Sequence, residues 1–193
     1  FTSGGLVTIS EDTSLDLVGV NTADIADLDS TAAVSDAGAT SVDITGLIDV
    51  SGTEITLGSG TFNAGSLAFT SAGLVTISEG SSLDLVGVNT AGIADLDSTA
   101  AVSDAGAVSV DVTGLLDVSG TSIALGSGTS VFNAGALTFN SAGSVNIDES
   151  SSMLVSGSST AGSGLELVST DDVTLDASVT VVGDTSILAG TTV

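Results

Sequence analysis

The sequence FTSAGLVTISEGSSLDLVGVNTAGIADLDSTAAVSDAG, residues 69–106, repeats almost unchanged the sequence FTSGGLVTISEDTSLDLVGVNTADIADLDSTAAVSDAG, residues 1–38. The likeness extends to residue 68 in the first copy and to residue 138 in the second, and only 11 of the 68 aligned positions differ. A third, diverged copy opens with FNSAGSVNIDESSS at Phe139 and runs to Val193. Such repetition predicts one continuous repeat structure over residues 1–193, with units 1–68, 69–138 and 139–193.

Each unit contains short segments in which apolar and polar residues alternate. Val75-Thr76-Ile77 and Leu83-Asp84-Leu85 are typical, and about nine such segments fit into one unit of about 70 residues. Alternation of period two, with β-branched residues and Gly, Ser or Asn between the segments, predicts β-strands. No stretch keeps the i, i+3, i+4 spacing of an amphipathic helix, so we expect an all-β protein.

Two all-β architectures fit short, regularly spaced strands. One is a small β-sandwich repeated like beads. The other is a parallel β-solenoid with about three strands and about 23 residues per coil, or about eight coils in all. We favour the solenoid, because sandwich strands usually run about 5–6 residues and join through tight hairpins. The Asn-Gly and Asp-Gly dipeptides of such hairpins are absent here.

Composition excludes several functions. The chain has 24 acidic residues and no Lys, Arg or His, for a formal net charge of −24. Without basic side chains, binding to nucleic acid or docking on an anionic membrane is not expected. The chain contains no Cys, so disulfides and thiolate chemistry are excluded. No apolar run reaches the ~20 residues of a membrane span. The chain opens at Phe1, inside a repeat, which is typical of a segment of a longer or processed polypeptide.

The strings LAFTSAGLVTI (67–77), LTFNSAGSVNI (137–147) and LVSTDDVTL (167–175) carry a family resemblance. They resemble the repeats of filamentous-haemagglutinin-type adhesins, which are secreted bacterial proteins. This resemblance implies a right-handed parallel β-helix and an extracellular or cell-surface location.

Outward-facing positions carry much of the charge, because the middle residue of an apolar-x-apolar strand points away from the core. Three coils per unit would place Asp16 one coil from Asp43, and Asp84 one coil from Asp111. The same scheme puts a second group of acidic residues on another side and leaves the third side neutral. The second group is Asp27, Asp49, Asp95 and Asp117; the neutral side carries Thr8, Thr56, Thr76, Ala124, Asn146 and Thr174.

Carboxylates stacked about 5 Å apart repel each other by roughly 0.8 kcal/mol in water, and a bound cation would remove that cost. Oxygen ligands suit Ca²⁺, so the weak calcium candidates are the acidic residues of ADIADLD and its second copy. They are Asp24, Asp27, Asp29, Asp95 and Asp97. The alternative is a solvated acidic surface that keeps the protein soluble.

The sequence offers less support for a catalytic carboxylate pair, for a contact site at the F-N-A-G segments and for an ice-binding face. Asp171 and Asp172 could be imagined as the carboxylate pair of an inverting glycosidase, but a turn is the simpler interpretation. The F-N-A-G segments are expected to form turns at Asn63 and Asn133, with Gly65 and Gly135 in the left-handed region. An ice-binding face would need paired Thr in a regular array, and Thr occurs singly here.

The sequence therefore predicts a non-catalytic structural segment, with no required cofactor, in the shaft of a bacterial surface fibre or adhesin. The expected contacts are end-to-end self-association through open solenoid ends and lateral packing through the neutral Thr/Ala side. The alternative function is an adhesin segment that itself binds carbohydrate or a host-cell partner.

Overall fold

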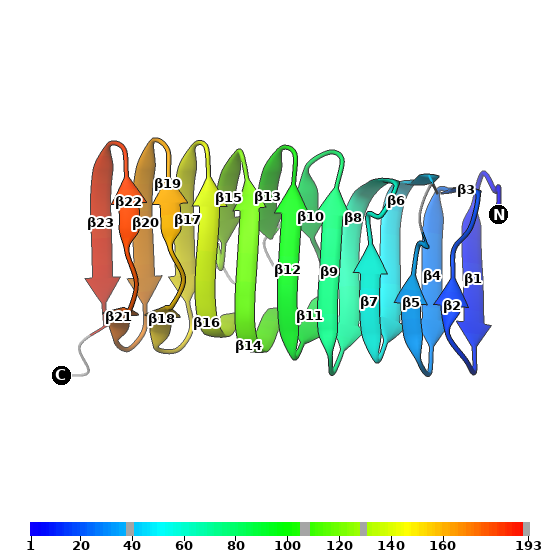
Figure 1. Ribbon diagram of the computed structural model, residues 1–193, viewed down its shortest axis with the longest axis horizontal. Coiled ribbons are helices and arrows are strands. Elements are labelled where there is room, and N and C mark those ends of the chain that lie inside the picture. Colours follow the sequence, from blue (N-terminus) through cyan, green and yellow to red (C-terminus); the bar gives the residue numbers. More distant parts are fainter. Residues whose placement is uncertain (38–40, 105–108, 128–130, 191–193) are drawn as a thin grey trace.

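The computed structural model describes residues 1–37, 41–104, 109–127 and 131–190. These residues form no helix, and they wind as a parallel β-solenoid of about nine turns. Strands on the near side of Figure 1 point upward while the chain advances from right to left, which is the right-handed sense. The predicted parallel β-helix is confirmed. Since the described part of the chain is all strand and loop, it contains no helix able to cross a membrane.

Most strands are short, and their order follows the sequence repeats. The first repeat contains β1 (Leu6–Glu11), β2 (Leu15–Asp16), β3 (Val20–Ala23), β4 (Ile25–Ser30), β5 (Ala33–Ser35), β6 (Ser41–Gly52), β7 (Glu54–Leu57) and β8 (Thr61–Ser71). The second contains β9 (Leu74–Glu79), β10 (Leu83–Leu85), β11 (Val88–Ala91), β12 (Ile93–Ser98), β13 (Ala101–Asp104), β14 (Ser109–Gly120), β15 (Ser122–Leu125) and β16 (Val131–Ser141). The third contains β17 (Ser144–Glu149), β18 (Met153–Val155), β19 (Ser159–Ala161), β20 (Gly164–Ser169), β21 (Val173–Leu175), β22 (Val179–Val181) and β23 (Asp184–Ala189).

The coils are shorter than predicted. Leu6 pairs with Ile25 on the next coil, and in the third repeat Leu165 pairs with Thr185. Even the longer step from Ala26 to its partner Ile48 falls below the expected coil length. The solenoid therefore has about nine turns, slightly more numerous and slightly shorter than the predicted coils, which were about eight coils of about 23 residues.

Four strands turn a corner of the solenoid without an intervening loop. In β6, Ser41–Ile44 pairs with β3, whereas the stretch from Ile48 onward pairs with β4. One strand thus serves two sides of the solenoid without an intervening loop, and β8, β14 and β16 do the same. Glycine permits this close turn: a Cβ on Gly65 would lie 2.3 Å from the carbonyl oxygen of Thr45.

The prediction of left-handed backbone at Gly65 and Gly135 is wrong. Positive φ angles occur at other glycines, namely Gly19, Gly58, Gly87, Gly126 and Gly183. Asn63 lies inside β8 and Asn133 inside β16, so the expected turns at these residues are also absent. The F-N-A-G segments require glycine for close backbone approach and not for an unusual φ angle.

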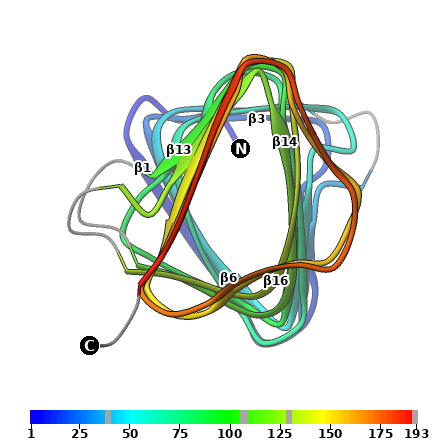
Figure 2. The same ribbon diagram turned by 90° about the vertical axis from the view of Figure 1, so that its left-hand side faces the viewer.

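One sequence repeat makes up slightly more than three turns of the solenoid. The first repeat supplies ten strand segments, because β6 and β8 each count twice, and three segments make one turn. Leu74 is the second-repeat equivalent of Leu6, yet its strand β9 stacks on β7 and not on the side formed by β1 and β4. Equivalent strands of successive repeats therefore lie on neighbouring sides. In Figure 2, seen along the axis, the blue and red coils have their corners at different places.

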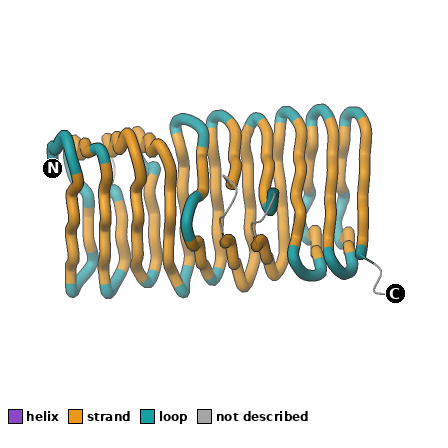
Figure 3. The backbone as a smooth tube through the Cα atoms, turned by 180° about the vertical axis from the view of Figure 1, so that it is seen from behind, coloured by secondary structure: helices purple, strands orange, loops and turns teal. Residues whose placement is uncertain are grey.

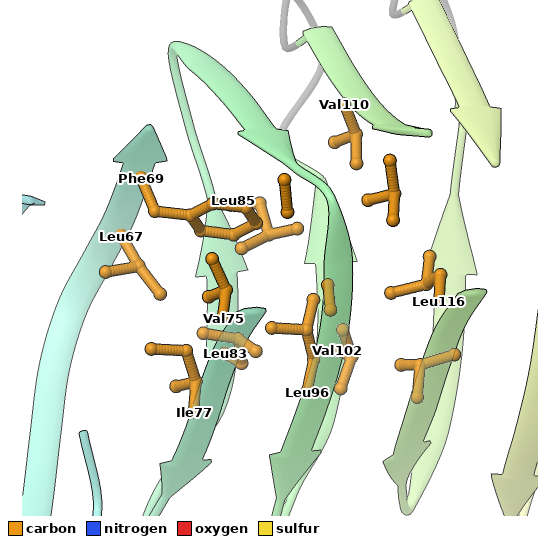
Figure 4. Packing of buried hydrophobic residues seen from close by; sticks show 14 of the residues in the cluster. Leu67, Phe69, Val75, Ile77, Leu83, Leu85, Leu96, Val102, Val110 and Leu116 are labelled. Carbon is orange, nitrogen blue, oxygen red and sulfur yellow. The ribbon is translucent and has the colours of Figure 1, made fainter. Parts of the chain in front are cut away.

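The core is one continuous aliphatic column inside the coils. It runs from Leu15 in β2 to Leu167 in β20, and Figure 4 shows its middle part, where Leu67, Phe69 and Leu85 meet. Four of the five phenylalanines are fully buried, namely Phe62, Phe69, Phe132 and Phe139. Figure 3 shows the strands forming the walls while the loops lie at the corners. The prediction that the middle residue of each triplet faces outward is confirmed in β10 and β18, where only the flanking residues are fully buried.

Candidate functional site

Two acidic ladders project from the solenoid walls. Asp27 of β4 pairs with Asp49 of β6, and Asp95 of β12 pairs with Asp117 of β14. The prediction that these four aspartates share one side is therefore correct only within each repeat. Because the repeat turns the solenoid by an extra third of a turn, the two ladders lie on neighbouring sides and not on one shared side.

Mutual repulsion and partial burial perturb these carboxyl groups. Burial, and then the charges of Asp27 and Asp29, raise the pKa of Asp49 above its ordinary value. Burial raises the pKa of Asp95 and of Asp117 as well, with Asp97 a further cause for both. The sequence contains no Lys, Arg or His to offset these charges.

Serine hydroxyl groups donate hydrogen bonds to one further aspartate in each acidic ladder. The Ser51 hydroxyl donates to Asp29 Oδ1 at 2.5 Å, and the Ser119 hydroxyl donates to Asp97 Oδ1. Both serines pair with their aspartates on the adjacent strand. Each acidic ladder therefore has a hydroxyl-bonded aspartate two residues beyond the carboxylate pair.

The calcium candidates do not converge into one cage. Asp24 lies at a corner before β4, where its Oδ1 accepts a hydrogen bond from the Thr45 hydroxyl at 3.1 Å. Gly92 stands in its place in the second repeat. Among the residues that the structure describes, no group of three or more acidic side chains is placed to hold a metal ion. Calcium binding at Asp27, Asp29, Asp95 and Asp97 stays a prediction.

The expected stacks of Asp16 on Asp43 and of Asp84 on Asp111 are wrong. Asp16 pairs with Ser35, whose hydroxyl donates to it, and Asp84 accepts from Ser103 at 3.0 Å. Asp43 pairs instead with Thr22 and Asn63. The cause is coil length, since a coil shorter than the predicted one brings a different residue above Asp16. These aspartates face hydroxyl groups and not other carboxylates.

The residues that the structure describes do not form a separate neutral side. Thr8 pairs with Asp27, and Thr76 pairs with Asp95. The threonines thus stand in the same ladders as the carboxylates. This removes the face through which lateral packing was expected.

Asp171 and Asp172 lie in the turn between β20 and β21, as the simpler interpretation predicts. The Asp172 carbonyl accepts the Met153 amide hydrogen at 2.8 Å. Both side chains are exposed, and Ser169 helps to hold the turn by donating its hydroxyl to the Asp172 carbonyl at 3.2 Å.

The described surface also has a shallow hollow near the C-terminal end, across β17, β20 and β23. Asn146 and Glu166 line it, and the Asn146 amide donates to Glu166 Oε2 at 2.9 Å. Its polar lining also includes the Asp184 carboxylate and hydroxyl groups such as that of Ser186. The hollow therefore holds two carboxylates, of which Glu166 is bonded to an amide.

Two buried carboxylates were missed by sequence reasoning. Glu79 of β9 is 1 % exposed and Glu149 of β17 is 0 % exposed. They occupy the same position of the second and third repeats, whereas Glu11 of the first repeat is exposed. Alternation was the available signal, because Val75, Ile77 and Glu79 fall on one face of the strand.

Asp36 of the first repeat and Asp104 of the second are also buried and hold equivalent positions. Asp36 accepts the amide hydrogens of Gly58 at 2.8 Å and Ser59 at 3.1 Å. Asp104 accepts that of Gly126 at 2.7 Å. These carboxylates fasten the loop that follows the strand one turn later, so their role is structural.

Comparisons with known protein families, with curated protein sequences and with solved structures found no match.

Proposed function

We propose that this chain is a non-catalytic structural segment of a fibre or adhesin shaft on a bacterial surface. The observation that carries the proposal is the unbroken aliphatic core, which extends through nearly every coil from β2 to β20. A column of this kind transmits force along its axis, because each coil is bonded to its neighbours by ladder hydrogen bonds and apolar packing.

The roles of the described carboxylates support a structural function. Asp36 and Asp104 fasten loops, Glu79 and Glu149 bond to backbone amides, and Asp16 accepts a hydroxyl of the next coil. The sequence also lacks His, Cys, Lys and Arg, the side chains that most often activate a nucleophile or stabilise an anionic intermediate.

The two ends of the solenoid support assembly along the axis. Within the described residues, β1 pairs only with β4 and β23 pairs only with β20, so each presents an unpaired backbone edge. Ile187 and Leu188 in β23 are 42 % and 55 % exposed. Further coils, whether from the same polypeptide or from another copy, would satisfy these edges and cover this apolar surface.

An extracellular location belongs to this proposal and rests on the resemblance of strings such as LTFNSAGSVNI (137–147) to secreted adhesin repeats. The surface charge is compatible with it, because 24 acidic residues keep parallel rods soluble and apart. Contact is thereby favoured at the ends and disfavoured along the sides.

The free edge of β23 can be blocked at one amide. The Gly190 amide bonds back to the Ser169 carbonyl of β20. Because amide directions alternate along a strand, the Thr185 amide then points away from β20, toward the open end. Thr185→Pro removes this outward hydrogen, whereas Thr185→Val keeps it and serves as the matched control.

Electron microscopy of the concentrated chain tests the assembly. We expect rods that lengthen with protein concentration in the wild type and in Thr185→Val, and single short rods for Thr185→Pro. Compact particles of constant size in the wild type would contradict the proposal. Binding of the isolated chain in a glycan array would instead support the alternative, a segment that itself contacts carbohydrate.

A further inference from the structure

A buried carboxyl group joins one repeat to the next at both repeat junctions. Glu79 Oε1 accepts the amide hydrogen of Ala64 at 3.1 Å, and Glu149 Oε1 accepts that of Ala134 at 2.9 Å. The amide belongs to the last coil of one repeat, and the glutamate to the first coil of the next. The same contact therefore forms twice, between equivalent residues.

The glutamate replaces a ladder hydrogen bond that the backbone does not make there. The Gly80 amide bonds to the Phe62 carbonyl at 2.8 Å, after which the upper chain turns away toward β10. The next amide on that edge of the lower coil, that of Ala64, is left for the carboxyl group. At the second junction the Ser150 amide bonds to the Phe132 carbonyl at 2.8 Å in the same way.

Only one oxygen of each carboxyl group is satisfied. Ser81 donates its hydroxyl to Glu79 Oε1 at 2.9 Å, and Ser151 donates to Glu149 Oε1 at 3.3 Å. The Oε2 atoms are buried and receive no hydrogen bond from the described residues. An ionised carboxylate in this position is buried and receives hydrogen bonds at only one of its two oxygens, which costs free energy. The neutral acid carries no buried charge, so its cost is lower.

No basic side chain faces these groups. From β6, the charge of Asp43 acts on Glu79 and disfavours its ionisation. Asp111 of β14 holds the equivalent place at the second junction, where it pairs with Asn133. The strands above present Ser98 and Ser169, and the sequence has no Lys, Arg or His.

We propose that Glu79 and Glu149 are protonation-controlled latches that hold successive repeats together as neutral acids and loosen the junction when they ionise. Loosening means local opening of the corner around Ala64 or Ala134, with the rest of the solenoid intact. The latch is a property of the repeat junction and does not depend on the proposed shaft function.

The direction of the pH effect follows from burial. Burial raises the pKa of both groups, and raises that of Glu149 from 4.5 to about 7. A group whose pKa is higher in the folded state binds its proton more tightly there. The stabilisation is therefore complete below pH 4.5 and is lost as the pH rises through about 7.

Amide hydrogen exchange measured from pH 5 to pH 9 tests the latch. In the wild type, we expect protection of the Ala134 amide, corrected for the intrinsic exchange rate, to fall by up to about 80-fold over this pH range, the factor that corresponds to a pKa raised from 4.5 to about 7. Glu149→Gln keeps the acceptor oxygen and removes the charge, so its protection should not vary with pH. Glu11→Gln alters the exposed equivalent and should behave as the wild type.

A second measurement needs no variant. The side-chain carboxyl carbon of each glutamate can be followed by NMR in the wild-type protein during a pH titration. We expect the Glu149 midpoint near 7 and its titration to coincide with the loss of Ala134 protection. Titration of Glu149 near its ordinary value of 4.5, or equal pH dependence in the wild type and Glu149→Gln, would overturn the proposal.

Discussion

Replacing Phe69 by alanine should destabilise the middle of the solenoid strongly, whereas the same change at Phe1 should have little effect. The two phenylalanines hold the same position of successive repeats. Phe69 is 0 % exposed and packs with Leu67 and Leu85 in the core (Figure 4). Phe1 is only partly buried. The pair therefore separates the effect of burial from the effect of sequence context.

The expected magnitude follows from the buried area. A phenylalanine buries about 200 Å², which at about 25 cal/mol per Å² amounts to about 5 kcal/mol as an upper bound. Measured costs of comparable truncations are about 3–5 kcal/mol. We therefore expect Phe69→Ala to lower the free energy of unfolding by about 3–5 kcal/mol, and Phe1→Ala by about 1 kcal/mol or less.

Urea denaturation followed by far-ultraviolet circular dichroism measures both values. Coils of a solenoid contact only their neighbours, so hydrogen exchange in β6 and β11, which pair with β8, should report the Phe69→Ala change locally. Equal destabilisation by the two variants, or a loss below about 1 kcal/mol for Phe69→Ala, would refute the packing described here.

Three further outcomes are expected. Gly135→Ala should destabilise by about 2 kcal/mol in urea denaturation, because a Cβ there would lie 2.3 Å from the Thr113 carbonyl oxygen, whereas Gly4→Ala meets nothing within 4 Å and should be neutral. Asp49→Asn should stabilise the fold by about 0.3 kcal/mol at pH 7 but not at pH 3. The raised pKa of Asp49 means that its ionisation, which occurs at pH 7, costs folding free energy, and solvent screening of this exposed group keeps that cost small. An equal gain at both pH values would contradict the repulsion. Sodium chloride should raise the melting temperature, because it screens the repulsion within the acidic ladders. An equal rise with calcium at matched ionic strength would count against the calcium site predicted from the sequence, whereas a calcium-specific excess that Asp27→Asn abolishes would establish it.

Strand positions were readable from the sequence because burial follows alternation closely. Val75 and Ile77 are fully buried, as are Leu83 and Leu85, while the residue between each pair is not. The pairing of Asp27 with Asp49 was likewise predictable, since both follow the same pattern of flanking apolar residues. Local alternation thus specifies which side chains enter the core.

Coil length was not predictable from the same pattern. A corner is usually signalled by polar residues that interrupt the strand, but Gly46 and Gly65 allow the chain to turn while strand pairing continues through β6 and β8. The step from Asp27 to Asp49 is 22 residues, close to the expected coil, whereas the step from Asp16 to Ser35 is only 19 residues. For this reason Asp27 and Asp49 were placed together correctly, whereas the partner assigned to Asp16 was wrong.

The buried glutamates show the same division between local and long-range information. Alternation places Glu79 on the inner face of β9, so its burial could have been inferred. Its hydrogen bond to Ala64 could not, because the contact depends on how the first coil of one repeat sits on the last coil of the preceding repeat. The exposed state of Glu11 shows that the residue alone does not determine its environment.

The register between coils is the central claim, and the chain contains no Cys, so paired cysteines labelled with pyrene can test it directly. Labels at Asp16→Cys and Ser35→Cys should give strong excimer fluorescence, because these residues are partners on adjacent strands. Labels at Asp16→Cys and Asp43→Cys should give little, because Asp43 pairs with Thr22 and Asn63. Strong excimer emission from the second pair and little from the first would contradict the register and, with it, the solenoid of about nine short turns.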